Sequence, residues 1–290
     1  MARELLPHSQ RVDNTRQPTK TGVRLRLLDE EAPALTRSAI VLAPHPDDEV
    51  LGCAGVLATR PTTVVHITDG VPPWAPVQSV PTLVTRRIEE CEAAWSVLQA
   101  TVTRVSLHHQ DARLFLNIPR LVEDLVALFT TTSSSDIHVP AYERGHPDHD
   151  TVHVAVQLAR RHVPRQNHTW IGYSLYSVDP SGATRFGFLD PIDYPHLPMD
   201  PGSVSLGVKR RAIREFSSQM SAGSILTQWL GNSASERYGQ LPHWAAPLSI
   251  LPCLYERRLT EMDDGIQPET LDNLLRSSLA TPTSASGEAP

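Results

Sequence analysis

The chain has 290 residues, of which 40% are hydrophobic and 20% are charged, and its formal net charge is −6. This composition is typical of a soluble globular protein. The mild acidic excess gives no reason to expect nucleic acid or an anionic membrane as a partner. Because no apolar stretch is long enough to span a bilayer and the N-terminus lacks the apolar core of a secretory signal, we expect a cytoplasmic protein.

Three cysteines, Cys53, Cys91 and Cys253, lie far apart in the sequence. An odd number of cysteines without a C-x-x-C pair is typical of reduced, packed thiols. A cysteine-based zinc site or a thiol nucleophile is therefore disfavoured.

Short apolar runs and helical stripes alternate along the middle of the chain. Such runs predict buried strands, and apolar residues three or four positions apart predict helices. In chain order we expect a strand at 38–43, a helix at 50–59, a strand at 63–68, a helix at 83–99, a strand at 102–107, a helix at 118–129, a strand at 136–140, a helix at 150–161 and a strand at 169–176. The alternation predicts a mainly parallel α/β sheet flanked by helices, a Rossmann-like three-layer sandwich with a less regular C-terminal part.

The two ends of the chain are less regular. Residues 1–20 are polar and predict a flexible N-terminal arm, and the low-complexity end predicts a disordered tail at 276–290. A single α/β domain is expected between them, at 21–275. Outside its alternating core we expect an edge strand at 23–28, a loop at 179–201 and a basic helix at 208–220.

Two dense clusters of histidine and aspartate follow predicted strands. Residues 43–49 read Ala-Pro-His-Pro-Asp-Asp-Glu, and residues 145–150 read Gly-His-Pro-Asp-His-Asp. In an open α/β sheet, ligands bind beyond the carboxyl ends of the strands. Imidazoles and carboxylates that converge there from separate elements are typical of a metal-centred hydrolytic site.

The spacing within the clusters suits metal coordination. His45 and Asp48 are three positions apart, as are His146 and His149, so a single turn brings each pair to one side. A divalent ion could take His45, Asp48 and one or both downstream histidines, with an open position for a water whose pKa the metal lowers. Asp47 then remains free as a general base, and a histidine not on the metal could act as an acid or stabilise an oxyanion.

A simpler interpretation is that Asp48 or Glu49 only caps the next helix, as acidic residues after a strand often do. Two dense clusters with the same spacing, each at a strand end, argue against capping as the whole explanation. Lone histidines are interpreted as surface or packed residues; examples are His66, His108, His138 and His168.

Residues 44–55, which read Pro-His-Pro-Asp-Asp-Glu-Val-Leu-Gly-Cys-Ala-Gly, together with His-Pro-Asp-His at 146–149, resemble the PIG-L/LmbE family of zinc-dependent N-acetylglucosaminyl deacetylases. The Thr-Asp-Gly turn at 68–70 is a smaller match. The resemblance covers about residues 38–160 and is thin from Tyr176 onward. It implies a metal-dependent hydrolase that removes an N-acetyl or other N-acyl group from an amino sugar or its conjugate. Its cofactor would be Zn²⁺, or another divalent metal such as Fe²⁺.

The resemblance also implies roles for the motif residues. It makes His45, Asp48 and His149 the metal ligands and Asp47 the general base that acts on the metal-bound water. His146 matches the histidine that stabilises the tetrahedral intermediate or protonates the leaving amine.

Further positions match the family less closely. Asp148 matches a carboxylate that orients a histidine, and Asp111 matches an acidic residue that binds a sugar hydroxyl in some members. Some members carry a tyrosine two residues before the first histidine of the second motif, where this chain has Arg144, with Tyr142 two residues earlier. Val71 replaces an acidic residue that often follows the Thr-x-Gly turn. These departures affect the substrate rather than the metal chemistry, and Arg144 and Tyr142 are candidate substrate contacts.

Several alternatives stay open at this stage. The amide could belong to a cysteinylated sugar conjugate, an acylated glycopeptide or an antibiotic precursor. Two histidines and a carboxylate also describe a non-haem iron oxygenase, which the free Asp47 disfavours. A non-catalytic sugar-binding relative is a further possibility, although both Asp47 and His146 are retained. The loops at 71–85 and 179–205 are expected to determine specificity, and the sequence does not indicate the oligomeric state.

Overall fold

The computed structural model describes residues 38–133, 135–143, 145–163, 168–178, 183–189, 194–195, 197, 202–232 and 236–241. The arm expected at 1–20, the strand expected at 23–28 and the tail expected at 276–290 lie outside these residues. Arg144 and Cys253 lie outside them as well.

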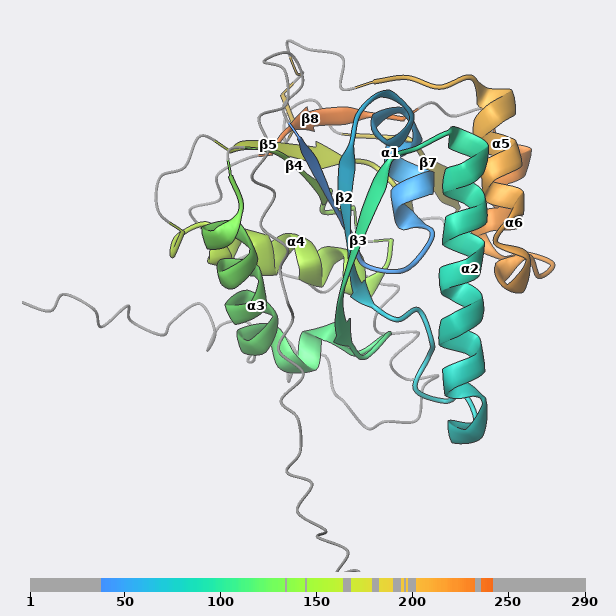
Figure 1. Cartoon of the computed structure of the whole chain (residues 1–290), viewed down its shortest axis with the longest axis horizontal. Helices are drawn as coiled ribbons and strands as arrows, with labels where there is room; N and C mark the ends of the chain where they lie inside the picture. Colours follow the sequence, from blue (N-terminus) through green and yellow to red (C-terminus); the bar gives the residue numbers. More distant parts are fainter. Residues whose placement is uncertain are drawn as a thin grey trace, which may run out of the picture. The chain divides into compact units, whose positions relative to one another are not determined.

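Six strands form one sheet in the order β3-β2-β1-β4-β5-β8 (Figure 1). The strands are β1 (Ala39–Ala43), β2 (Thr62–Thr68), β3 (Val102–His109), β4 (Asp136–Pro140), β5 (Thr169–Tyr173) and β8 (Tyr238–Gln240). The first five are parallel, and β8 pairs antiparallel with β5. A separate antiparallel pair consists of β6 (Tyr176–Val178) and β7 (Thr184–Phe186). The predicted mainly parallel α/β sheet is confirmed.

Helices cover both faces of the sheet. The helices are α1 (Asp48–Thr59), α2 (Val80–Leu98), α3 (Ile118–Thr131), α4 (Pro147–Ala159), α5 (Leu206–Arg214) and α6 (Ile225–Gly231), with 3₁₀ turns η1 (Val77–Ser79), η2 (Leu114–Asn117) and η3 (Ser217–Gln219). Side chains alternate along a strand, so Val41 of β1 packs into a core with α1, α2, α5 and α6, whereas Leu42 packs into a core with α3 and α4. Burial on both faces explains why the central strands are continuous apolar runs.

Two helices begin three residues earlier than the sequence pattern predicts. α2 starts at Val80 rather than Leu83, and α4 starts at Pro147 rather than Asp150. A proline lies in the first turn of each helix, where its missing N–H has no intrahelical partner to lose. The second cluster therefore lies in the first turn of α4 instead of before it. The helix expected at 208–220 ends at Arg214, and η3 follows it.

The strand expected at 169–176 divides into β5 and β6. The division falls at Leu175, whose backbone N–H donates to Glu143 Oε2 at 2.6 Å. A side chain thus takes a donor that would otherwise serve a strand ladder, and the chain turns away at Tyr176. The loop expected at 179–201 contains β7.

The two motifs meet at the point where the strand order reverses. β1 and β4 are neighbours, yet the helix that follows β1 packs on one face and the helix that follows β4 packs on the other. This divergence opens a crevice beyond the carboxyl ends of the two strands, the usual ligand position in open α/β sheets.

The cysteine interpretation holds for Cys53 and Cys91, which are free and buried. Burial raises the pKa of both thiols well above the usual value. Among the described residues, no helix combines the length and the apolar character that a bilayer crossing requires.

Candidate active site

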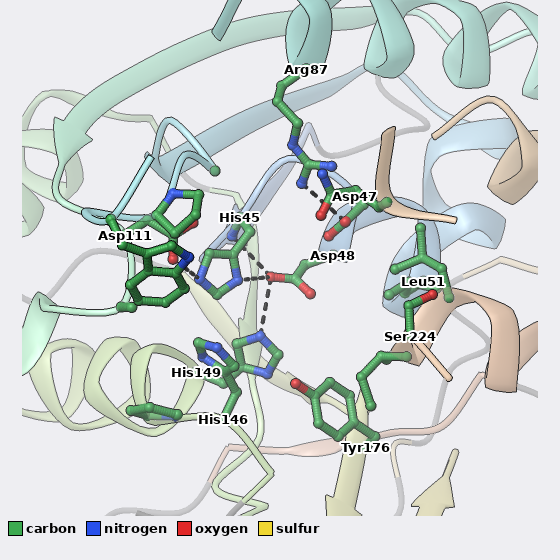
Figure 2. Close-up of a pocket in the computed structure, with 18 residues that line it drawn as sticks. His45, Asp47, Asp48, Leu51, Arg87, Asp111, His146, His149, Tyr176 and Ser224 are labelled. Carbon is green, nitrogen blue, oxygen red and sulfur yellow. Dashed lines mark hydrogen bonds and ion pairs between the residues drawn. The ribbon is translucent and has the colours of Figure 1, made fainter. Parts of the chain in front are cut away.

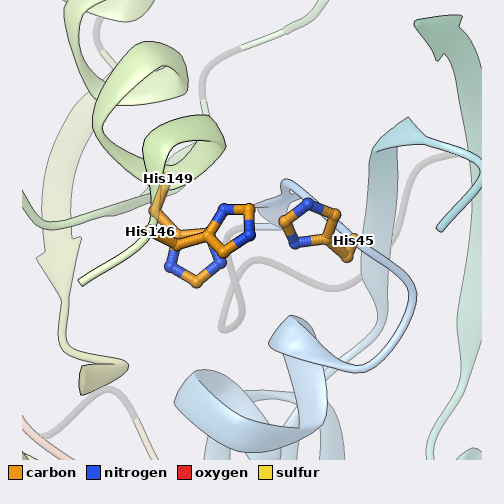
Figure 3. Close-up of side chains that lie close together, drawn as sticks. All are labelled: His45, His146 and His149. Carbon is orange, nitrogen blue, oxygen red and sulfur yellow. The ribbon is translucent and has the colours of Figure 1, made fainter. Parts of the chain in front are cut away.

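Three histidine rings meet in the crevice (Figure 3). His45 follows β1, His146 is the N-cap of α4, and His149 lies in the first turn of that helix. The ring centroids are 4.7 Å apart for His45 and His146, 5.3 Å for His45 and His149, and 4.8 Å for His146 and His149. Each ring offers a nitrogen that lies within 4.8 Å of the nitrogens of the other two.

The Asp48 carboxylate lies between two of these rings (Figure 2). Its Oδ2 is 3.1 Å from His45 Nδ1 and 3.3 Å from His149 Nε2, and it accepts the backbone N–H of His45 at 2.9 Å. Burial alone would raise the pKa of Asp48, but the rings of His149 and His45 outweigh burial and hold this pKa well below its usual range. Asp48 is therefore ionised.

Two further carboxylates face the other side of the His45 ring. Asp148 Oδ2 is 3.1 Å from His45 Nε2, and Asp111 Oδ1 is 3.3 Å from the same atom. Asp148 is fully buried and accepts the backbone N–H groups of Ala112 at 2.6 Å and Leu114 at 3.2 Å. Asp148 is thus fixed by the backbone and in turn orients His45.

These side chains fit a divalent cation. Three carboxylates, from Asp48, Asp111 and Asp148, surround the His45 ring. His149 Nδ1 is buried and has no hydrogen-bond partner among the described residues. A bound cation would offset the negative charge, and imidazole nitrogens with carboxylate oxygens are the donors that zinc and other divalent transition metals take.

Asp47 points away from Asp48 and is held by a different group. Its Oδ2 lies 3.0 Å from Nη2 of Arg87, which also donates to the backbone carbonyl of Pro46. Burial raises the pKa of Asp47 to about 7, although the Arg87 charge opposes this shift. Asp47 has φ 138°, a region that residues other than glycine rarely adopt. A carboxyl group with this pKa can accept a proton near neutral pH.

One neighbour holds the Asp47 backbone, and another makes room for Arg87. Glu49 is fully buried; its Oε2 accepts the Asp47 backbone N–H at 3.1 Å, and its Oε1 accepts the Trp95 indole N–H at 3.0 Å. Gly70, at φ +65°, lies so close that a Cβ there would be 2.9 Å from Arg87 Nε. The Thr-Asp-Gly turn noted in the sequence therefore has a packing role: it makes room for the arginine that holds Asp47.

The ring of His146 has a defined hydrogen-bond arrangement. Its Nδ1 accepts the backbone N–H of Asp148 at 3.2 Å, which caps α4. A ring nitrogen that accepts a hydrogen bond carries no proton, so the proton of a neutral His146 lies on Nε2. This leaves Nε2 as the atom that can donate within the crevice.

A cavity of about 450 Å³ encloses most of the predicted site residues. His45, Asp47, Asp48, Asp111, His146 and His149 line it, and Asp148 is buried behind His45. Sequence reasoning missed other side chains of this lining, which are Leu51, Tyr176, Gln219, Ser224, Ile225 and Leu226. Tyr176 had one usable signal: it stands at the carboxyl end of the fifth predicted strand.

One predicted substrate contact is not brought into the cavity. Tyr142 is not among the lining residues; its backbone N–H donates to the Tyr194 hydroxyl at 2.6 Å, and its ring lies 6.1 Å from that of His153. The expected specificity loop at 71–85 contributes to the lining through Pro72 and Trp74. No described residue of 179–205 lines the cavity.

Comparison with known proteins identifies the motif-bearing segment. Residues 40–159 match the family GlcNAc-PI de-N-acetylase, PIG-L. The resemblance that the two motifs indicate is therefore confirmed. No curated protein matches the chain.

Several solved structures have a similar arrangement. N,N'-diacetylchitobiose deacetylase from Pyrococcus horikoshii is 19% identical, with a TM-score of 0.49 over 67% of this chain and 74% of that one. The zinc-inhibited form of teicoplanin deacetylase Orf2 is 19% identical, with a TM-score of 0.44 over 63% and 85%. The conserved protein TT1542 from Thermus thermophilus is 20% identical, with a TM-score of 0.48 over 73% and 98%.

Proposed function

We propose that this protein is a metal-dependent hydrolase that removes an N-acetyl, or other N-acyl, group from an amino sugar or amino-sugar conjugate. The observation that carries the proposal is the convergence of His45, His146 and His149 with the ionised Asp48, beside an Asp47 whose pKa lies at about 7. The match of this segment to the PIG-L family supports the same reaction.

His45, Asp48 and His149 are the side chains that would hold the metal ion. A divalent ion there supplies Lewis acidity, which polarises an amide carbonyl and makes water more acidic. Zn²⁺ is the ion we expect, because its usual catalytic sites combine histidine and carboxylate donors and keep one position open. Fe²⁺ accepts the same donors.

Asp47 is suited to take the proton from the attacking water. Its pKa of about 7 places the carboxylate and the carboxylic acid in comparable amounts near neutral pH, which favours proton transfer in either direction. Arg87 and Glu49 fix its orientation, so the base does not have to be ordered when substrate binds.

His146 is suited to act on the other side of the amide. The Nε2 N–H of a neutral His146 can donate a hydrogen bond to the oxyanion of the tetrahedral intermediate. Proton transfer to the nitrogen of the leaving amine requires the imidazolium form, in which Nδ1 no longer accepts the Asp148 N–H. Asp148 holds both His45, through its side chain, and His146, through its backbone N–H. One buried residue thus couples the positions of a predicted ligand and the predicted acid.

The proposal is tested by measuring acetate release from N-acetylglucosamine and a panel of its conjugates. The protein would be stripped with a chelator and then reloaded with Zn²⁺ or Fe²⁺. We expect turnover of at least one amino-sugar amide by the reloaded protein and none by the stripped protein. If metal-loaded protein releases acetate from no member of the panel, the proposed function is wrong.

A further inference from the structure

The cavity that contains the candidate active site has two chemically different parts. Its floor holds the motif histidines and carboxylates, with Arg87. The rest of its lining includes apolar side chains from three separate parts of the chain, which are Leu51, Pro72, Trp74, Ile225 and Leu226. Figure 2 shows Leu51, Ser224 and Tyr176 on the side of the cavity opposite Asp111. We call the five apolar residues the outer wall, which has one part at Leu51 and α6 and a second part in the loop of Pro72 and Trp74.

Few polar groups interrupt this apolar lining. Beyond the floor, the lining side chains that can form hydrogen bonds are those of Gln219, Ser224 and Tyr176, together with the indole N–H of Trp74. Ser224 Oγ already accepts the backbone N–H of Thr227 at 3.2 Å, as the N-cap of α6. Sugar hydroxyls need hydrogen-bond partners when they leave water. A wall of this composition suits an apolar group better than a second sugar.

Hydrogen bonds within the protein hold the α6 part of the outer wall in place without a ligand. Glu90 of α2 is buried and accepts hydrogen bonds from the backbone N–H of Ser218 at 2.7 Å and from the Ser218 and Ser217 hydroxyls at 2.6 Å and 3.1 Å. These bonds tie η3, and the start of the segment that leads to α6, to the helix that follows the Trp74 loop. Leu51 and Leu226 are 5% and 6% exposed.

Trp74 is the exception in this wall, because 64% of its surface is exposed. Covering an exposed indole that lines a cavity with an apolar ligand is favourable, because apolar surface is removed from water. The cavity volume of about 450 Å³ also lies within the range of about 300–1,000 Å³ that is usual for small-molecule sites.

We propose that the outer wall binds an apolar substituent of the amino-sugar substrate, with Trp74 in contact with the bound group. This inference rests on the proposed function and narrows its substrate class to amino sugars that carry an apolar group. The group has two chemical sources: an alkyl or aryl aglycone on the sugar, or an N-acyl chain longer than acetyl.

The test compares substrates that differ only in this group. One arm uses methyl and phenyl β-glycosides of N-acetylglucosamine; the other uses N-acetyl- and N-hexanoylglucosamine. We expect kcat/KM to favour the apolar member of one arm, which identifies the source. Trp74→Ala should lower kcat/KM for that member by about tenfold, equivalent to about 1.4 kcal/mol, and leave the small member nearly unchanged.

Val77→Ala is the matched control, because Val77 is 84% exposed on the same connection and does not line the cavity. It should leave all four substrates unaffected. An equal loss for small and apolar substrates in Trp74→Ala would show that the indole stacks on the sugar ring, and the inference would then be wrong. No preference for an apolar member in either arm would also contradict it.

Binding of phenyl β-glucoside, which has no amide, separates this inference from the proposed function. Calorimetric titration should show binding to the wild type and to Val77→Ala, and weaker binding to Trp74→Ala. If this pattern holds while no amide is hydrolysed, the apolar site stands and the proposed reaction fails. If amides are hydrolysed without apolar preference and phenyl β-glucoside does not bind, the reaction stands and the apolar site fails.

Discussion

Histidines occupy two electrically opposite regions of this fold. At the carboxyl ends of the strands, His45 lies among carboxylates; burial would lower its pKa, but Asp111 and Asp148 outweigh burial and raise it well above the usual value. Within β4, His138 lies 3.2 Å from Nη2 of Arg60, and burial together with this positive charge lowers the pKa of His138 to about 3. The charges around a buried imidazole thus decide whether it can serve a cation site or only packs as a neutral ring.

The same contrast occurs along a single helix. His149, in the first turn of α4, faces Asp48, whereas His153, one turn later, is fully buried and its Nδ1 donates to the Pro140 carbonyl at 2.8 Å. Burial lowers the pKa of His153 to about 4. Substitutions of these two histidines, four residues apart on one helix, can therefore compare a site residue with a core residue.

The largest effect is expected when a site histidine is removed. His149→Ala deletes a predicted ligand, so the protein should lose most of its metal and its amide hydrolysis should fall below detection. Elemental analysis after dialysis measures the metal. His153→Asn, one turn further along α4, should retain full metal content. A fully loaded His149→Ala protein would show that the ligand set is wrong.

The next effect concerns the carboxylate that we assign as the base. Asp47→Asn keeps the size of the side chain but cannot take a proton, so kcat should fall by roughly 10²–10⁴-fold. Metal content should stay at the wild-type level, because Asp48 rather than Asp47 faces the histidines. Steady-state kinetics measure kcat, and elemental analysis of the same preparation measures the metal content. A kcat near the wild-type value would assign the base to another group.

Two roles are open to His146, proton donor or metal ligand, because its ring approaches both other site histidines. If it is the acid, His146→Ala keeps its metal, loses about 100-fold in kcat and loses the basic limb of the pH–rate profile. If it is a fourth ligand, the variant loses metal as readily as His149→Ala. The metal content of the two variants, measured side by side, separates these roles.

The core fold and the motif residues could be predicted because their signals are local. Buried parallel strands are apolar runs, and both His/Asp clusters directly follow such runs, so the switch point in the sheet brings them together. The sequence also predicts that lone histidines such as His66, His108 and His138 are packed or surface residues; His66 and His138 are buried and His108 is exposed.

The other side of the cavity could not be predicted, since its position depends on tertiary contacts. Ser218 is held by Glu90, more than a hundred residues earlier, and no periodicity near 217–226 indicates that pairing. Tyr142 was an expected substrate contact by its place near the second motif. Its backbone is instead bound by Tyr194, a long-range contact without a local signature.

The smallest effect concerns stability. It tests the prediction that His153 is a neutral residue of the core. His153 has a pKa of about 4 in the folded protein and about 6.5 in the unfolded chain. Between these values the unfolded chain binds a proton that the folded protein does not, so the free energy of unfolding decreases as the pH falls through this window. Asparagine at this position can still donate to the Pro140 carbonyl but cannot be protonated.

His153→Asn should therefore remove part of the acid sensitivity. Between pH 7.5 and pH 5, the wild-type free energy of unfolding should fall by about 2 kcal/mol more than that of the variant. Urea unfolding in the presence of a chelator measures it, because the site histidines then titrate alike in both proteins and cancel. The variant also loses the contact between His153 Nε2 and Gln157, which lowers its stability by a similar amount at both pH values. If the free energy of unfolding depends on pH in the same way in both proteins, His153 has an ordinary pKa in the core. The contrast between His149 and His153 would then rest on metal binding alone.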